Sequence, residues 1–188
     1  PEHSGSKRLR TLDLFHGAGG SSYGAKKAGV EIVAAIDQWR VAGQAYQQNF
    51  PEAQVFTNDI TSLSADRLRA AIGKIDLLLA SPECTNHTCA KGGGERCEES
   101  KMTAFQVVKF AKAFRPRWIV VENVVQMKSW SRHPELLEEL WGLGYYVKEE
   151  QLNAADFGVP PTRNRLFLLC SLTGEASAPA IIDQPYKP

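Results

Sequence analysis

The fold of this chain is decided by the stretch Asp13-Leu14-Phe15-His16-Gly17-Ala18-Gly19-Gly20. An apolar run ends in this stretch, glycines follow, and a helical pattern to about residue 28 begins there. A glycine turn between a strand and a helix lets the backbone approach a ligand at the carboxyl end of the strand. Asp37 stands 20 residues after Gly17, at the end of the next predicted strand, where a carboxylate can bind both ribose hydroxyls. We therefore predict a nucleotide-type site, the alternative being a tight turn that binds nothing.

Short β-type runs alternate with segments of helical periodicity on both sides of this turn, which is typical of a parallel sheet covered by helices on both faces. The predicted strands are 9–15, 31–37, 54–56, 75–80 and 118–122. Two later runs, 145–152 and 166–171, are joined by a proline-rich loop and are expected to form an antiparallel pair at the sheet edge. The predicted class is α/β, with a mostly parallel twisted sheet.

Length and composition limit the remaining possibilities. A chain of 188 residues with 43% hydrophobic side chains suits one core, which we place at 9–173; we expect 1–8 to be a tag or disordered and 174–188 to be a loosely ordered tail. The 22 basic and 21 acidic residues give no argument for nucleic acid from overall charge. The apolar runs are too short to span a membrane, so we expect a cytoplasmic or nucleoid-associated protein with reduced cysteines.

A candidate nucleophile lies in Ala80-Ser81-Pro82-Glu83-Cys84-Thr85-Asn86-His87, directly after the apolar strand 75–80. A thiol is the best nucleophile among side chains at neutral pH, and a loop that follows a strand can present it at the edge where α/β sheets bind ligands. The alternative is a small buried cysteine that only packs.

Two further motifs place charge at the same edge. Glu122, in Val120-Val121-Glu122-Asn123-Val124, ends the next strand and can hold or deliver a proton if it shares a pocket with Cys84; otherwise it caps a turn. Arg163 and Arg165, in Gly158-Val159-Pro160-Pro161-Thr162-Arg163-Asn164-Arg165, alternate along an extended segment and should point to one face. Guanidinium groups suit bidentate contacts to phosphate, base or carboxylate, although such pairs are often a solvated face.

In this order and spacing, the four motifs together resemble the cytosine-5 DNA methyltransferase family. The elements Asp-Leu-Phe-x-Gly-x-Gly-Gly, Pro-x-Cys, Glu-Asn-Val and Arg-x-Arg carry the resemblance, which runs from about Thr11 to Leu169. It implies a Rossmann-like, S-adenosylmethionine-dependent methyltransferase fold, in which 9–173 is the catalytic domain.

The resemblance also implies S-adenosylmethionine as cofactor and a set of residues that bind it. Asp37 and Trp39 would contact its ribose and adenine, and Asp59 with Ile60 would touch the adenine. The pocket would be completed by Phe15, Gly17, Gly19, Gly20 and Pro82.

For catalysis, the resemblance implies that the Cys84 thiolate adds to carbon 6 of a cytosine flipped out of duplex DNA. Glu122 would hold the N3 and amino edge of the base, and Arg165 would orient the base with help from Arg163. The product would be 5-methylcytosine in DNA.

The sequence departs from the family at Glu83, His16 and Pro161, where proline, a small residue and glutamine are usual. The family's target-recognition region and final helix do not appear, so we expect a subunit or fragment that needs a separate recognition part.

Two alternatives stay open, a tRNA cytosine-5 methyltransferase and a non-catalytic binding module of the same fold. We predict no metal, because a zinc site would have irregular spacing and consume the nucleophile; its ligands would be Cys84, His87, Cys89 and Cys97.

Overall fold

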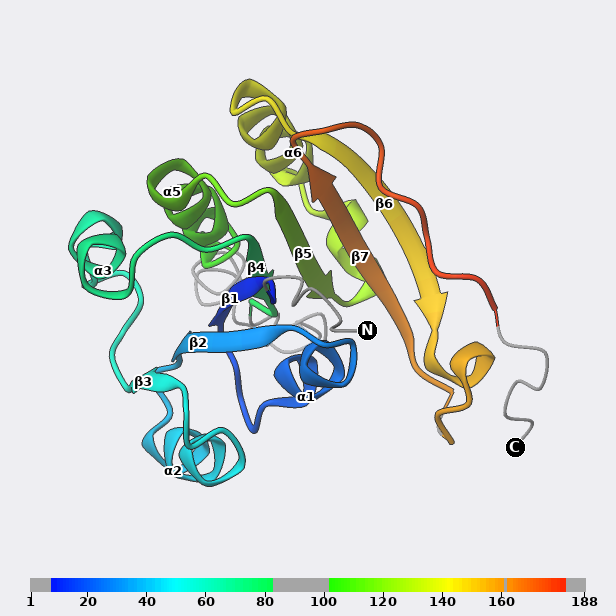
Figure 1. Ribbon diagram of the computed structural model, residues 1–188. Coiled ribbons are helices and arrows are strands. Elements are labelled where there is room, and N and C mark those ends of the chain that lie inside the picture. Colours follow the sequence, from blue (N-terminus) through cyan, green and yellow to red (C-terminus); the bar gives the residue numbers. More distant parts are fainter. Residues whose placement is uncertain (1–7, 83–101, 161, 182–188) are drawn as a thin grey trace, which may run out of the picture.

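The computed structural model describes residues 8–82, 102–160 and 162–181. Within these residues, seven strands form one mixed sheet in the order β3-β2-β1-β4-β5-β7-β6 (Figure 1). The predicted class, an α/β protein with a mostly parallel sheet and an antiparallel pair, is confirmed.

Five strands are parallel, and β1 lies at their centre. They are β1 (Arg10–Leu14), β2 (Glu31–Ile36), β3 (Gln54–Phe56), β4 (Leu77–Ala80) and β5 (Trp118–Asn123). The chain moves from β1 to β2 and β3 on one side and then crosses to β4 and β5 on the other. Ligands of open α/β sheets bind at the carboxyl ends of the strands where the order reverses, which here is between β1 and β4.

The antiparallel pair is β6 (Tyr146–Asn153) and β7 (Asn164–Ser171), with β6 outermost as predicted. Strand β7 inserts between β5 and β6 and runs antiparallel to both. It begins two residues earlier than predicted, at Asn164. Because β7 is reversed, its first residues lie at the edge where the parallel strands end, as the pairing of Asn123 with Leu166 shows.

Helices cover both faces of the sheet (Figure 1). On one side lie α1 (Gly20–Lys27) and α2 (Arg40–Asn49). On the other lie α3 (Ala65–Ile72), α5 (Phe105–Phe114) and α6 (His133–Gly142). Two short 3₁₀ helices that the sequence analysis did not predict, η1 (Val125–Ser129) and η2 (Ala154–Phe157), follow β5 and β6.

The larger core lies between the sheet and the α3, α5 and α6 layer. Leu12, Leu78, Ile119 and Phe110 have no exposed surface there, and full burial of one such side chain stabilises the fold by roughly 1.5–3 kcal/mol. A smaller core joins Tyr46 and Phe50 of the α2 segment to β2. Among the helices of the described residues, none combines the length and apolar character needed to cross a membrane.

Gly19 is where the glycine turn meets α1, and only glycine fits there. Its φ is +94°, and a Cβ built on it would lie 2.6 Å from Phe50 Cε2 and 3.0 Å from Tyr46 Cδ2. The backbone of the turn therefore rests directly on two aromatic rings. Gly24, one turn further along α1, has no atom within 4 Å of such a Cβ.

We expect Gly19→Ala to lower the free energy of unfolding by about 2 kcal/mol, because it combines left-handed backbone strain with overpacking against buried rings. Gly24→Ala is the matched control and should raise it by about 0.5–1 kcal/mol through helix propensity. Urea denaturation of both variants measures the difference. Equal stability of the two variants would contradict the packing described for Gly19.

Candidate active site

Those predicted site residues that the structure describes lie at the carboxyl edge of the parallel strands. The glycine turn follows β1, Asp37 follows β2, and Glu122 lies near the end of β5. Strands β4 and β5 are neighbours in register, with Ala80 opposite Val121, so Pro82 lies at the same edge. Strands β4 and β5, which precede the Cys84 motif and carry Glu122, are therefore adjacent as expected. Cys84 itself lies outside the described residues, so its place beside Glu122 stays a prediction.

Asp37 fixes the glycine turn. Its Oδ2 accepts a hydrogen bond from Gly17 N at 2.9 Å, and its Oδ1 accepts one from Trp39 N at 2.8 Å. Each carboxylate oxygen has two lone pairs, so both keep capacity for an outside donor such as a ribose hydroxyl. Gly17 (φ +51°) and Gly20 have no atom within 4 Å of an added Cβ, so their backbone borders open space.

A cavity beside Asp37 brings together four of the predicted cofactor residues: Phe15, Asp37, Asp59 and Ile60. Sequence reasoning missed the other residues that line it, which are Ile36, Gln38, Thr61 and Thr103. Trp39 does not line this cavity, and 62% of its surface is exposed.

The Asp59 side of this cavity is held by hydrogen bonds. Thr61 N donates to Asp59 Oδ1 at 2.9 Å, and this backbone hydrogen bond lowers the pKa of Asp59. The Lys109 ammonium on α5 donates to the carbonyl oxygens of Ile60 and Thr61, both at 3.3 Å. Helix α5 thus anchors the loop after β3.

A second and larger cavity, of about 900 Å³, joins the glycine turn to the end of β5. Its lining includes Gly17 and Gly20 of the turn, Ser81 after β4, and Glu122 and Arg163 from the far side. One continuous space therefore connects the predicted cofactor turn with the predicted catalytic carboxylate.

Glu122 is held by both predicted arginines, which lie on one face as expected. Arg165 Nε lies 2.9 Å from Glu122 Oε1, and Arg163 Nη2 lies 3.6 Å from the same oxygen. The Glu122 and Arg165 side chains are each 24% exposed, whereas Arg163 is 56% exposed. Glu122 is thus a partly exposed carboxylate with two guanidinium partners.

Asn123 links the ends of β4 and β5, a role that sequence reasoning missed. Its buried side chain donates from Nδ2 to the carbonyl oxygen of Pro82 at 3.4 Å, and its Oδ1 accepts from Val124 N at 2.7 Å. The only signal in the sequence was its place beside Glu122. The residues of the zinc alternative lie outside the described residues, within which no group of three His, Cys, Asp or Glu side chains is placed to hold a metal ion.

A buried polar cluster lies under the glycine turn. Asp13 on β1 has no exposed surface, accepts a hydrogen bond from Ser22 on α1, and has its pKa raised by burial to about 7. His16 is 5% exposed, and its ring packs on Tyr46 of α2 with centroids 4.2 Å apart. Burial lowers the pKa of His16, so this ring is neutral at pH 7.

Comparisons with known proteins agree with this arrangement. Residues 9–187 match the model of the C-5 cytosine-specific DNA methylase family. The type II methyltransferase M.DdeI of Desulfomicrobium norvegicum is 34% identical over 167 residues, which are 86% of this chain and 40% of that protein. M.HgiDI of Herpetosiphon aurantiacus is also 34% identical, over 86% of this chain and 52% of its own length. This chain thus spans about half the length of these relatives.

Solved structures share the fold. The Dnmt2 methyltransferase of S. pombe superposes with a TM-score of 0.73 at 26% identity, over 92% of this chain and 52% of that chain. A putative DNA modification methyltransferase from an E. coli prophage gives a TM-score of 0.79 at 24% identity, over 94% and 52%. With the family model matching nearly the whole chain, this protein belongs to the C-5 cytosine-specific DNA methylase family.

Proposed function

We propose that this chain is the catalytic part of an enzyme that transfers a methyl group from S-adenosylmethionine to carbon 5 of cytosine in DNA, with Cys84 as covalent nucleophile. The observation that carries the proposal is the single cavity that joins the glycine turn to Glu122 and Arg163. Strand β4 lies between β1, which leads into the turn, and β5, which carries Glu122. Cys84 comes four residues after the end of β4 at Ala80.

Membership of the family implies S-adenosylmethionine as the methyl donor, and the residues present fit it. The backbone at Gly17 and Gly20 faces open space, and Asp37 keeps acceptor capacity for ribose hydroxyls. The cavity walls at Phe15 and Ile60 offer apolar surface for a purine. The cofactor supplies an electrophilic methyl group on a sulfonium; Asp59, Gly19, Gly20, Pro82 and Trp39 complete the proposed set of cofactor residues.

Cytosine carbon 5 is a weak nucleophile, and in the proposal Cys84 activates it. The Cys84 thiolate would form a carbon–sulfur bond at carbon 6, and the ring electrons would move to carbon 5. Carbon 5 would then take the methyl group, and the bond between that methyl and the sulfonium sulfur would break to leave neutral S-adenosylhomocysteine. A general base would remove the carbon 5 proton, and the electrons of that carbon–hydrogen bond would restore the double bond between carbons 5 and 6. The bond from carbon 6 to sulfur would break, and Cys84 would leave as thiolate. The enzyme would end the cycle unchanged, and the cytosine would carry a methyl group on carbon 5 in place of the proton.

Glu122 is proposed to hold the N3 and amino edge of the cytosine and so to favour thiolate addition. The pair between Glu122 and Arg165, 2.9 Å apart, fixes the carboxylate before the base arrives. Arg163, which is more exposed, is proposed to assist at the cavity mouth. A carboxylate held by two arginines is preorganised, which lowers the cost of orienting it in the reaction.

DNA is the proposed substrate, and a separate recognition part is the proposed partner, since the relatives are about twice as long as the matching region. The reacting carbons of cytosine lie inside a duplex stack, so the base has to be flipped out.

The deciding experiment incubates the chain with methyl-labelled S-adenosylmethionine and either mixed DNA or tRNA, followed by nucleoside analysis. Product in tRNA alone would replace the DNA proposal with the RNA alternative.

We expect Cys84→Ala to abolish 5-methylcytosine formation while S-adenosylmethionine binding is retained, because the variant lacks the attacking sulfur. The same purified protein is used for isothermal titration with the cofactor and for the methyl-transfer assay. Methyl transfer that survives in Cys84→Ala would rule out the covalent route.

Glu122→Gln should reduce the methyl-transfer rate by about 10²–10⁴-fold, the range over which positioned acid–base groups contribute. Glu138→Gln, which changes an exposed carboxylate on α6, is the matched control and should leave the rate unchanged. Single-turnover rates at saturating cofactor make the comparison. A Glu122→Gln rate within a few-fold of the control would remove Glu122 from the proposed mechanism.

A further inference from the structure

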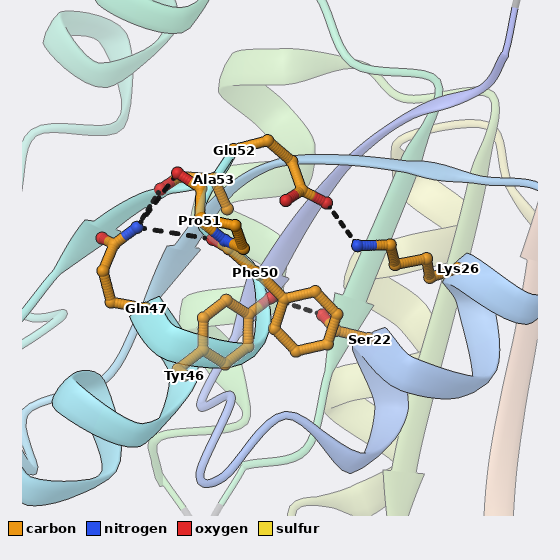
Figure 2. A network of polar contacts seen from close by, with 8 residues as sticks. All are labelled: Ser22, Lys26, Tyr46, Gln47, Phe50, Pro51, Glu52 and Ala53. Atoms are coloured by element: carbon orange, nitrogen blue, oxygen red, sulfur yellow. Dashed lines mark hydrogen bonds and ion pairs between the residues drawn. The ribbon is translucent and has the colours of Figure 1, made fainter.

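Three buried polar groups from three elements form a chain beneath the glycine turn. Ser22 Oγ donates to Asp13 Oδ2 at 2.6 Å, and Tyr46 Oη lies 2.5 Å from Ser22 Oγ. A serine hydroxyl has one proton, which here points to Asp13, so the Tyr46 hydroxyl donates to Ser22. Figure 2 shows the Tyr46–Ser22 contact bridging α2 and α1. The hydrogen bonds thus run in series from α2 through α1 to β1.

Aromatic packing fixes this chain in place under the turn. The Tyr46 ring packs on Phe50 with centroids 4.5 Å apart and on His16 of the turn at 4.2 Å. The same two rings, Tyr46 and Phe50, lie under Gly19. An exposed ion pair between Lys26 and Glu52, at 2.7 Å, joins α1 to the turn that follows α2 (Figure 2).

The charge of Asp13 is set by the groups that face it. Burial opposes its ionisation most strongly, the Ser22 hydrogen bond favours it, and the nearby Asp37 carboxylate opposes it, so that the pKa of Asp13 is about 7. Tyr46 faces it through Ser22, and His16 lies in the turn above as a neutral ring. Within the described residues Asp13 Oδ1 is buried without a hydrogen-bond partner, so Ser22 carries the stabilisation of the charge. Asp13 therefore changes charge near physiological pH.

We propose that Ser22 and Tyr46 are positioning residues for cofactor binding: their hydroxyls, acting in series, keep the Asp13 carboxylate charged beneath the glycine turn, and this charge favours a cationic cofactor over a neutral one. This inference rests on the proposed function. S-adenosylmethionine carries a sulfonium charge that its demethylated product, S-adenosylhomocysteine, lacks. Asp13 lines neither cavity, but it is buried on β1 two residues before Phe15, which lines both. Its charge would act on the cation through the protein between them, where the dielectric is lower than in water.

The pH dependence follows from the sign of this interaction. As pH rises from 6 to 7.5 through about 7, Asp13 ionises, and the affinity for S-adenosylmethionine rises while that for S-adenosylhomocysteine changes less. Ser22→Ala removes the hydrogen bond that favours the charge, so the midpoint of the affinity curve should move up by about one pH unit. Tyr46→Phe keeps the ring and removes only the second donor, so its midpoint should move up by less.

The experiment is isothermal titration of both ligands into wild type, Ser22→Ala, Tyr46→Phe and Asp13→Asn across this pH range. Asp13→Asn should bind S-adenosylmethionine with no midpoint near 7 and with a preference over S-adenosylhomocysteine that is reduced several-fold. Tyr23→Phe is the matched control, because Tyr23 lies one residue further along α1 and is 58% exposed. It should match wild type at every pH.

A second readout needs no ligand. The pKa of Asp13 is raised from about 3.9 in an unfolded chain to about 7 in the folded one, so its contribution to stability is full at pH 4 and is lost as pH rises to 7. The melting temperature of the wild type should fall over that window relative to that of Asp13→Asn. In Ser22→Ala the fall should extend to higher pH. A merely structural hydroxyl would lower stability equally at all pH values.

The inference would be overturned if both Ser22→Ala and Tyr46→Phe kept the wild-type pH midpoint of S-adenosylmethionine affinity and the wild-type preference over S-adenosylhomocysteine. The proposed function would still stand. Tyr46→Phe decides the question if Ser22→Ala fails to fold. Absence of binding of either ligand by the wild-type chain would overturn the proposed function and this inference together.

Discussion

The hydrogen bond from Gly17 N to Asp37 Oδ2, 2.9 Å long, is the interaction on which the site depends. It ties the turn after β1 to the end of β2 and so fixes the backbone of the turn relative to the sheet. Phe15, two residues before Gly17, has a φ of +60°, a conformation that costs a non-glycine residue of order 1–3 kcal/mol. Its backbone N–H also donates to the Ile36 carbonyl, so the neighbouring strand holds this strained residue in place.

The direction of β7 explains how two arginines reach a site built on parallel strands. A parallel strand after β5 would have brought its last residues to this edge, whereas the antiparallel β7 brings its first ones. Glu122 lies opposite Phe167 in this pairing, and Arg165 is two residues away on the same face. The proline-rich loop therefore delivers the guanidinium groups to the carboxylate without a crossover helix.

Much of the fold could be predicted from the sequence because its signals are local. Apolar runs and glycine punctuation located every strand to within a few residues, and the rule that ligands bind at strand carboxyl ends placed Asp37 beside Gly17. The Asn123–Pro82 and Tyr46–Ser22–Asp13 contacts could not be predicted, because they depend on how helices rotate on the sheet. The Glu122–Arg165 pair could be predicted in part. Both residues were identified from the sequence as site residues, but their contact depends on the β5–β7 register, which the sequence does not show.

The residues that destabilise the fold, through burial of polar groups or backbone strain, are concentrated beneath and within the glycine turn. A buried carboxyl, a buried neutral histidine and a left-handed phenylalanine all lie between Asp13 and Gly17. Apolar residues of similar shape at these positions would avoid the desolvation penalty, since burying a polar group is unfavourable unless it is fully paired. The sheet tolerates them because β1 is paired on both sides, with β2 and with β4, and is covered by aromatic rings from α2. A strand paired on both sides therefore carries these unfavourable residues, and its pairing can hold a charged site in place without distortion of the surroundings.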